Sequence, residues 1–91
     1  MTTAQLTQLR RLIKANPLLI WYTQNYDQLD AEVIVEAILN YGSWQQVTAL
    51  HHTLGLSTTS KIFHELLSRP RHNFQPLTYH FFSLYYARHA S

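Results

Sequence analysis

The sequence has no cysteine, two glycines and three prolines among its 91 residues. The lack of cysteine excludes disulfides, thiolate nucleophiles and zinc sites built on thiolates. The glycines, Gly42 and Gly55, lie thirteen residues apart, and this spacing leaves no glycine-rich loop for binding phosphate. Because 46% of the residues are hydrophobic and chain-breaking residues are few, we expect one folded domain rather than a disordered chain.

Charged residues are also scarce, at 13% of the chain against roughly 25% in a usual soluble domain. The surface must therefore be rich in neutral polar, histidine and aromatic groups, a composition that suits a binding partner. The net charge of +2 conceals an asymmetry, because residues 1–54 carry three basic and four acidic side chains, whereas residues 55–91 carry four basic and one acidic. An acidic ligand is expected to prefer the second part.

Long apolar runs are missing as well. The longest spans the five residues Leu18 to Tyr22, far too few to cross a bilayer. Residues 1–14 lack the apolar segment of a signal peptide. We therefore expect a cytoplasmic protein without contact to membranes.

The stretch over residues 33–55 has the pattern of two helices joined by a sharp turn. Apolar side chains recur at helical spacing before Gly42 and again from Trp44 to Gly55. Gly42 is expected to end the first helix with a positive φ, and Ser43 to cap the second helix with its hydroxyl. The two apolar stripes must share one core, in which Trp44 is the expected anchor.

Helices are predicted on both sides of this hairpin. The hydroxyl residues at 57–60 offer caps for a helix through Leu67, and Pro76 suits the first turn of a last helix that runs to about His89. The predicted fold is all-α, a single compact bundle of about five helices with a centre like a helix-turn-helix. The domain comprises residues 1–91: an N-terminal helix at 1–16, a loop at 17–30 that Trp21 anchors and Asp30 ends as a helix cap, and a helical core at 31–91.

The predicted last helix carries two apolar stripes. One consists of Leu77, Phe81, Leu84 and Tyr85, and the other, on roughly the opposite side, of Tyr79, Phe82 and Tyr86. A domain this small can hardly cover both stripes. The second stripe is therefore covered either by the first helix or by another molecule.

The turn after Leu54 resembles that of a helix-turn-helix DNA reader, in which glycine makes the bend and serine begins the recognition helix. The sequence departs from that pattern at His51, where a small residue is usual, and at Lys61, where an apolar one is usual. The resemblance implies two groups of contacts: Ser57, Thr58, Thr59, Ser60 and Lys61 in the major groove, and Arg69, Arg71 and His72 on phosphates.

Catalytic and metal sites are not indicated. No two of the six histidines stand four residues apart in a helix with a carboxylate nearby, so surface histidines are expected. The acidic residues Asp27, Asp30, Glu32 and Glu36 fit a loop and a helix N-terminus better than a catalytic carboxylate pair. We predict a non-enzyme with no catalytic residue, no cofactor and no metal.

Several segments occur in a familiar order: Trp21, EAILNYGSW over residues 36–44, the helix to Gly55, Ile62, and residues 74–82. This order resembles a family of small helical domains of unassigned chemistry, found in bacteria beside AbiEii-type nucleotidyltransferase toxins and commonly taken for their antitoxins. The resemblance spans Leu18 to Tyr86, although Ser43 stands where the family often has Asp. It implies a protein partner and no catalysis.

The sequence therefore favours two functions. The first is an antitoxin-like module that binds a nucleotidyltransferase-type toxin, and its proposed partner-binding residues are Tyr79, Phe82, Tyr86, Arg69 and Arg71, because Tyr and Arg are enriched at interface hot spots. The alternative is a helix-turn-helix transcriptional regulator that binds DNA. A homodimer built on the aromatic stripe is a third, structural possibility.

Overall fold

A computed structural model of the chain describes residues 2–15, 29–70 and 73–90. These residues form five α-helices: α1 (Thr3–Ala15), α2 (Ala31–Tyr41), α3 (Trp44–Leu54), α4 (Leu56–Leu67) and α5 (Pro76–His89). The predicted all-α fold is confirmed. None of these five helices combines the length and the apolar character that crossing a membrane requires. The predicted anchor Trp21 lies outside the described residues, as does nearly all of the predicted loop.

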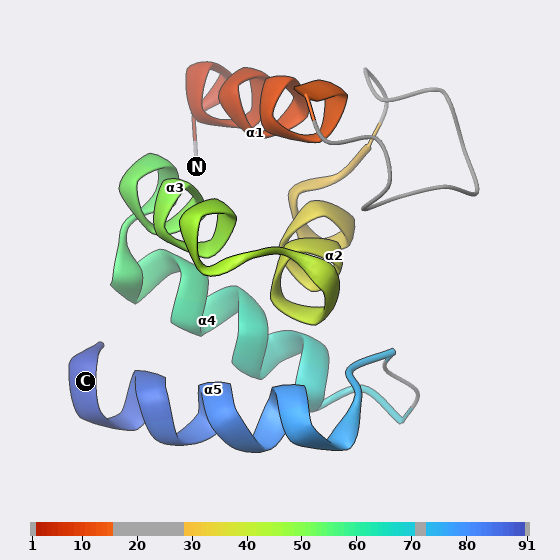
Figure 1. Cartoon of the computed structure of the whole chain (residues 1–91), viewed down its shortest axis with the longest axis vertical. Coiled ribbons are helices and arrows are strands. Elements are labelled where there is room, and N and C mark those ends of the chain that lie inside the picture. Colours follow the sequence, from red (N-terminus) through yellow and green to blue (C-terminus); the bar gives the residue numbers. More distant parts are fainter. Residues whose placement is uncertain (1, 16–28, 71–72, 91) are drawn as a thin grey trace.

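The helices follow one another in layers across the molecule (Figure 1). α1 packs on α2 and α3, these two pack on α4, and α5 packs on α4 from another side. α4 is therefore the central helix. The ring of its fully buried Phe63 packs against Phe74, Phe82 and Tyr86, with ring centroids 5.2 to 6.2 Å apart. The other buried apolar side chains are Leu9, Ile13, Ile34, Val35, Ala37, Ile38, Leu39, Val47, Leu50, Leu54, Ile62 and Leu66.

Two helices begin with reciprocal polar caps, and the cap at Ser43 is the one predicted above. The Ser43 hydroxyl accepts a hydrogen bond from the Gln46 N–H at 3.2 Å, and the Gln46 side chain accepts one from the Ser43 N–H at 2.8 Å. Thr2 and Gln5 make the same reciprocal pair at the start of α1. Such capping boxes satisfy backbone N–H groups that have no partner within the helix.

The two glycines end their helices as predicted but for different reasons, and the positive φ expected at Gly42 is not found. Gly42 has a φ of −75° rather than a positive φ. A side chain is excluded there by space, because a Cβ atom would lie 2.6 Å from the carbonyl oxygen of Ile38. Gly55, between α3 and α4, has a φ of 86° and a ψ of 151°, a combination that is essentially restricted to glycine.

The prediction that Trp44 anchors the core is also wrong. Its side chain is 53% exposed. The central aromatic position in the core is filled by Phe63 of α4 instead. The Trp44 ring packs edge-on against Phe81 and Tyr85 of α5 at the surface.

Candidate functional site

α5 has an apolar stripe on each of two sides, and the structure shows which one it buries. Phe82 and Tyr86 point inward. The centroids of their rings lie 6.2 and 5.4 Å from the ring centroid of Phe63 in α4. α5 packs mainly on α4, and this packing covers only one of its stripes. The other stripe is exposed, at 85% for Leu77, 49% for Phe81 and 62% for Leu84.

This orientation corrects the predicted set of partner-binding residues. Phe82 and Tyr86 belong to the core, so they are not available to a partner. Tyr79 remains partly exposed. Arg69 is exposed but is engaged in an ion pair with α2, and Arg71 lies outside the described residues.

Trp44 extends the exposed stripe of α5 onto α3. The centroid of its ring lies 5.4 Å from that of Tyr85 and 6.2 Å from that of Phe81, with edge-on geometry in both cases. Phe81 and Tyr85 stack on each other at 5.9 Å. The three rings form one continuous aromatic surface. We call the surface made by Leu77, Phe81, Leu84, Tyr85 and Trp44 the α5 outer face.

Three shallow hollows flank the α5 outer face, and none of the three is lined by a carboxylate. One, of about 450 Å³, lies between α3 and α5 and contains His51 and His52. Another, of about 280 Å³, is bordered by Arg88 and His89. The third runs beside Leu77 and has no ionisable side chain in its lining. The α5 outer face is therefore neutral to positive in charge.

A partly buried polar contact holds α5 against α3. The Nε2 atom of His51 and the hydroxyl oxygen of Tyr86 are 2.8 Å apart and share a hydrogen bond. Burial lowers the pKa of His51, and the neighbouring His52 lowers it further. Burial also raises the pKa of the Tyr86 hydroxyl far above its usual value of 10, with a smaller contribution from Tyr85. Both side chains are therefore held in their uncharged forms at neutral pH.

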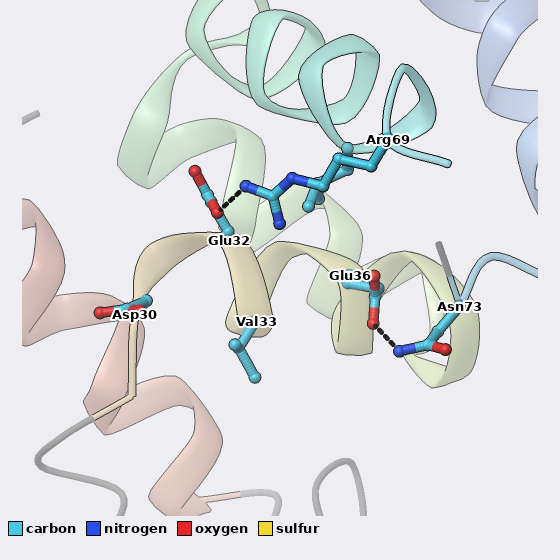
Figure 2. A pocket seen from close by; sticks show the side chains of 7 residues that line it. Asp30, Glu32, Val33, Glu36, Arg69 and Asn73 are labelled. Carbon is cyan, nitrogen blue, oxygen red and sulfur yellow. Dashed lines mark hydrogen bonds and ion pairs between the residues drawn. The ribbon is translucent and has the colours of Figure 1, made fainter. Parts of the chain in front are cut away.

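A separate hollow of about 260 Å³ lies between α2 and the segment after α4 (Figure 2). Glu32 accepts a hydrogen bond from Arg69 at 2.6 Å, and Glu36 accepts one from Asn73 at 3.2 Å. Asp30 also lines this hollow; it stands at the N-cap position of α2, as predicted, but its side chain makes no capping hydrogen bond. The two glutamates thus act as structural partners of the segment that leads into α5.

Asn40 continues this row of contacts along α2. Its side chain donates to the Asn73 carbonyl at 3.0 Å and accepts from the Gln75 N–H at 3.1 Å. Glu32, Glu36 and Asn40 are spaced four residues apart, so they share one face of the helix. A single face of α2 therefore sets where α5 begins.

Within the described ranges, no three His, Cys, Asp or Glu side chains are placed to hold a metal ion.

The predicted DNA-contacting residues of α4 do not form one exposed row. Thr59 is fully buried, and its hydroxyl donates to the carbonyl of Gly55 at 2.8 Å, so the prediction that Thr59 reaches a DNA groove is wrong. The remaining members of the set divide into exposed side chains, Ser57 and Lys61, and partly buried ones, Thr58 and Ser60.

The joint between α3 and α4 also differs from the predicted turn. α4 begins at Leu56, before the hydroxyl residues that are predicted to cap it, and Gly55 alone separates the two helices. The turn of a DNA-binding helix-turn-helix has about three to four residues. Of the three predicted phosphate contacts, Arg69 is engaged by Glu32, while Arg71 and His72 lie outside the described residues.

Comparison of the chain with protein-family models, curated proteins and solved structures finds no match. Burying the large apolar side chains of the α5 outer face would stabilise the protein, yet the described helices leave Leu77 and Leu84 mostly exposed and Trp44 and Phe81 about half exposed.

Proposed function

We propose that this chain is a non-catalytic protein-binding module that docks on its partner through the α5 outer face. The observation that carries the proposal is the exposure of Leu77 and Leu84 beside the half-exposed rings of Trp44 and Phe81. Single exposed apolar side chains are normal, whereas a contiguous patch of them marks an interaction site. Because these side chains project from helices, the face presents them to a partner in a defined arrangement.

The chemistry of the face favours a protein over a nucleic acid. Trp and Tyr are enriched at the hot spots of protein interfaces, and two leucines extend the apolar area on either side of the rings. A nucleic-acid groove needs several Lys or Arg side chains along the phosphates. Among the residues that line the three hollows, Arg88 is the one permanent cation. The absence of carboxylates from these linings further favours a partner with a neutral or acidic surface.

For the identity of the partner, we propose a nucleotidyltransferase-type toxin, with this chain as its antitoxin. This part of the proposal depends on the resemblance of the sequence to a family of presumed antitoxins. Trp44 belongs both to the Tyr-Gly-Ser-Trp segment of that resemblance and to the α5 outer face. The resemblance and the exposure of the ring therefore support the same surface.

The proposal is tested by purifying the tagged chain from cells of its native host after nuclease treatment. Mass spectrometry identifies the bound protein, and a titration with that purified protein gives the Kd. We expect a nucleotidyltransferase, bound at least about tenfold more weakly by the Leu77→Ser/Leu84→Ser variant than by the wild type. The matched control is Ala4→Ser/Gln8→Ser, which changes two exposed side chains on α1, at the far end of the molecule (Figure 1).

Three outcomes count against the proposal. Equal Kd values for the wild type and the Leu77→Ser/Leu84→Ser variant would overturn the docking surface. Another class of protein bound through this face would overturn the toxin assignment while leaving the docking surface in place. Recovery of nucleic acid alone, from a parallel purification without nuclease, would overturn the proposal as a whole and favour the DNA-binding alternative.

A further inference from the structure

The exposed stripe of α5 has a symmetric spacing. Leu77, Phe81, Leu84 and Arg88 follow one another at intervals of four, three and four residues. These are the intervals between the a and d positions of a coiled coil. Because the order of intervals is the same in both directions, two antiparallel copies of α5 place Phe81 opposite Leu84 and Leu77 opposite Arg88. The stripe is thus complementary to itself under a twofold rotation.

The charges on α5 favour this antiparallel arrangement. Arg88 and His89 lie in the last turn, and the helix contains no acidic residue. A parallel pair would bring the two Arg88 side chains together. In the antiparallel pair they are offset by eleven residues, or about 16 Å along the axis, which is roughly twice the Debye length at physiological ionic strength. The aliphatic part of Arg88 can then cover Leu77 while its guanidinium group reaches water.

The apolar area of the face sets the expected strength of the pair. Half-exposed Trp44 and Phe81 present roughly 100 Å² each, and the two leucines bring the total to roughly 400 Å². A standard stable interface removes about 800 Å² from each partner. A second copy on this face is therefore expected to bind reversibly, with a Kd in the micromolar range or weaker.

We propose that α5 pairs with α5 of a second copy of this chain, antiparallel, about a twofold axis that passes between Phe81 and Leu84. The inference rests on the proposed function, because both take the α5 outer face to be an interface. The inference goes beyond the proposed function by naming what covers the face when no other partner is bound, which is a second copy of this chain. A partner that binds the same face more tightly displaces the second copy.

Sedimentation equilibrium of the full chain tests the pairing over concentrations from about 1 to about 500 μM, a range set by the expected affinity. The wild type is expected to pass from monomer to dimer. Leu84→Glu places two carboxylates in the apolar seam and should leave the chain monomeric throughout. Gln8→Glu, on the exposed side of α1, is the control and should dimerise like the wild type. Far-UV circular dichroism verifies that the variants keep their helices.

The register is tested separately with single-cysteine variants, which the cysteine-free sequence makes straightforward. A mixture of Leu77→Cys and Arg88→Cys chains, oxidised with diamide, is expected to give the mixed disulfide as the main product. Leu77→Cys alone should cross-link poorly, since the two thiols would be offset by about 16 Å along the axis. Preferential cross-linking of Leu77→Cys to itself would contradict the antiparallel register.

A wild-type chain that stays monomeric at all concentrations would overturn the inference, and so would a dimer that Leu84→Glu leaves intact. These failures differ from failure of the proposed function. A monomeric chain that binds a different protein through the α5 outer face retains the proposed function and loses the inference. A Leu84-dependent dimer that binds no other protein retains the inference and loses the toxin-binding function.

Discussion

The imidazole of His51 and the hydroxyl of Tyr86 are joined by a hydrogen bond of 2.8 Å, which connects α3 to the buried side of α5. The Tyr85 ring stacks on the same imidazole at 5.9 Å. His51 is therefore contacted both from the buried side of α5, by Tyr86, and from the edge of the α5 outer face, by Tyr85. These contacts fix the orientation in which α5 presents its outer face.

The first prediction concerns the pH dependence of stability. The pKa of His51 lies below its ordinary value of 6.5, mainly because the ring is partly buried. Below about pH 6.5 the unfolded chain therefore binds more protons at this site than the folded chain does. This contribution to the free energy of unfolding is complete above that pH and is lost as the pH falls toward the folded-state pKa.

Urea denaturation at a series of pH values from 5 to 8 checks this expectation about His51. The His51→Gln variant should lose less stability than the wild type on going from neutral to acidic pH, because its amide keeps a hydrogen-bonding group without titrating. His52→Gln is the control and should retain most of the wild-type dependence. Identical pH profiles for the wild type and His51→Gln would show that His51 does not carry the effect.

The second prediction concerns the strength of the contact between His51 and Tyr86. Tyr86→Phe keeps the ring beside Phe63 but removes the hydroxyl, so it is expected to lower the free energy of unfolding by about 1 kcal/mol. A double-mutant cycle with His51→Ala isolates the interaction, and we expect a coupling energy of about 1 kcal/mol. Strictly additive effects of the two changes would mean that the hydrogen bond contributes nothing to stability.

The third prediction compares two contacts that hold the segment before α5. Asn40 makes two hydrogen bonds to backbone groups, whereas Arg69 and Glu32 make a single ion pair between flexible side chains that are 51% and 42% exposed. Asn40→Ala should therefore lower the free energy of unfolding by about 1–2 kcal/mol, and Arg69→Ala by less than about 1 kcal/mol. Chemical denaturation measures both values, and the reverse order would contradict the positioning role of Asn40.

The fourth prediction concerns the two glycines. Gly55→Ala places a side chain in a backbone conformation that is essentially restricted to glycine, with an expected loss of about 1–3 kcal/mol. Gly42→Ala forces the new Cβ against the Ile38 carbonyl and should lose a similar amount through crowding, about 1–3 kcal/mol. Thermal unfolding monitored by circular dichroism measures both. An unchanged stability for Gly42→Ala would show that the end of α2 moves without strain.

Several parts of the fold could be predicted from local signals. Ser43 with Gln46 and Thr2 with Gln5 carry the side chains that begin a helix, and Pro76 is suited to the first position of α5. Such signals act within one turn of the chain, so the sequence contains all that they require. The exception is α4, which begins at Leu56 because Gly55 already occupies its N-cap position.

The side chains that make up the candidate site could not be assigned from the sequence in the same way. α5 has large apolar side chains on opposite sides, and periodicity alone does not decide which side is buried. The choice depends on Phe63 of α4, against which Phe82 and Tyr86 pack. The outward position of Trp44 also depends on Phe63. Phe63 fills the centre of the hydrophobic core, where the sequence pattern predicts the Trp44 indole.

Both proposals require that another protein surface covers the α5 outer face in the cell. Hydroxyl-radical footprinting measures this coverage by comparing oxidation of Trp44 and Phe81 in cells of the native host with oxidation in dilute purified protein. Tyr41, which is 49% exposed and lies outside the face, serves as the internal control. We expect Trp44 and Phe81 to be protected in the cell relative to Tyr41 and to become reactive on dilution. Equal oxidation of the two rings in both settings, relative to Tyr41, would show that the α5 outer face stays uncovered in the cell.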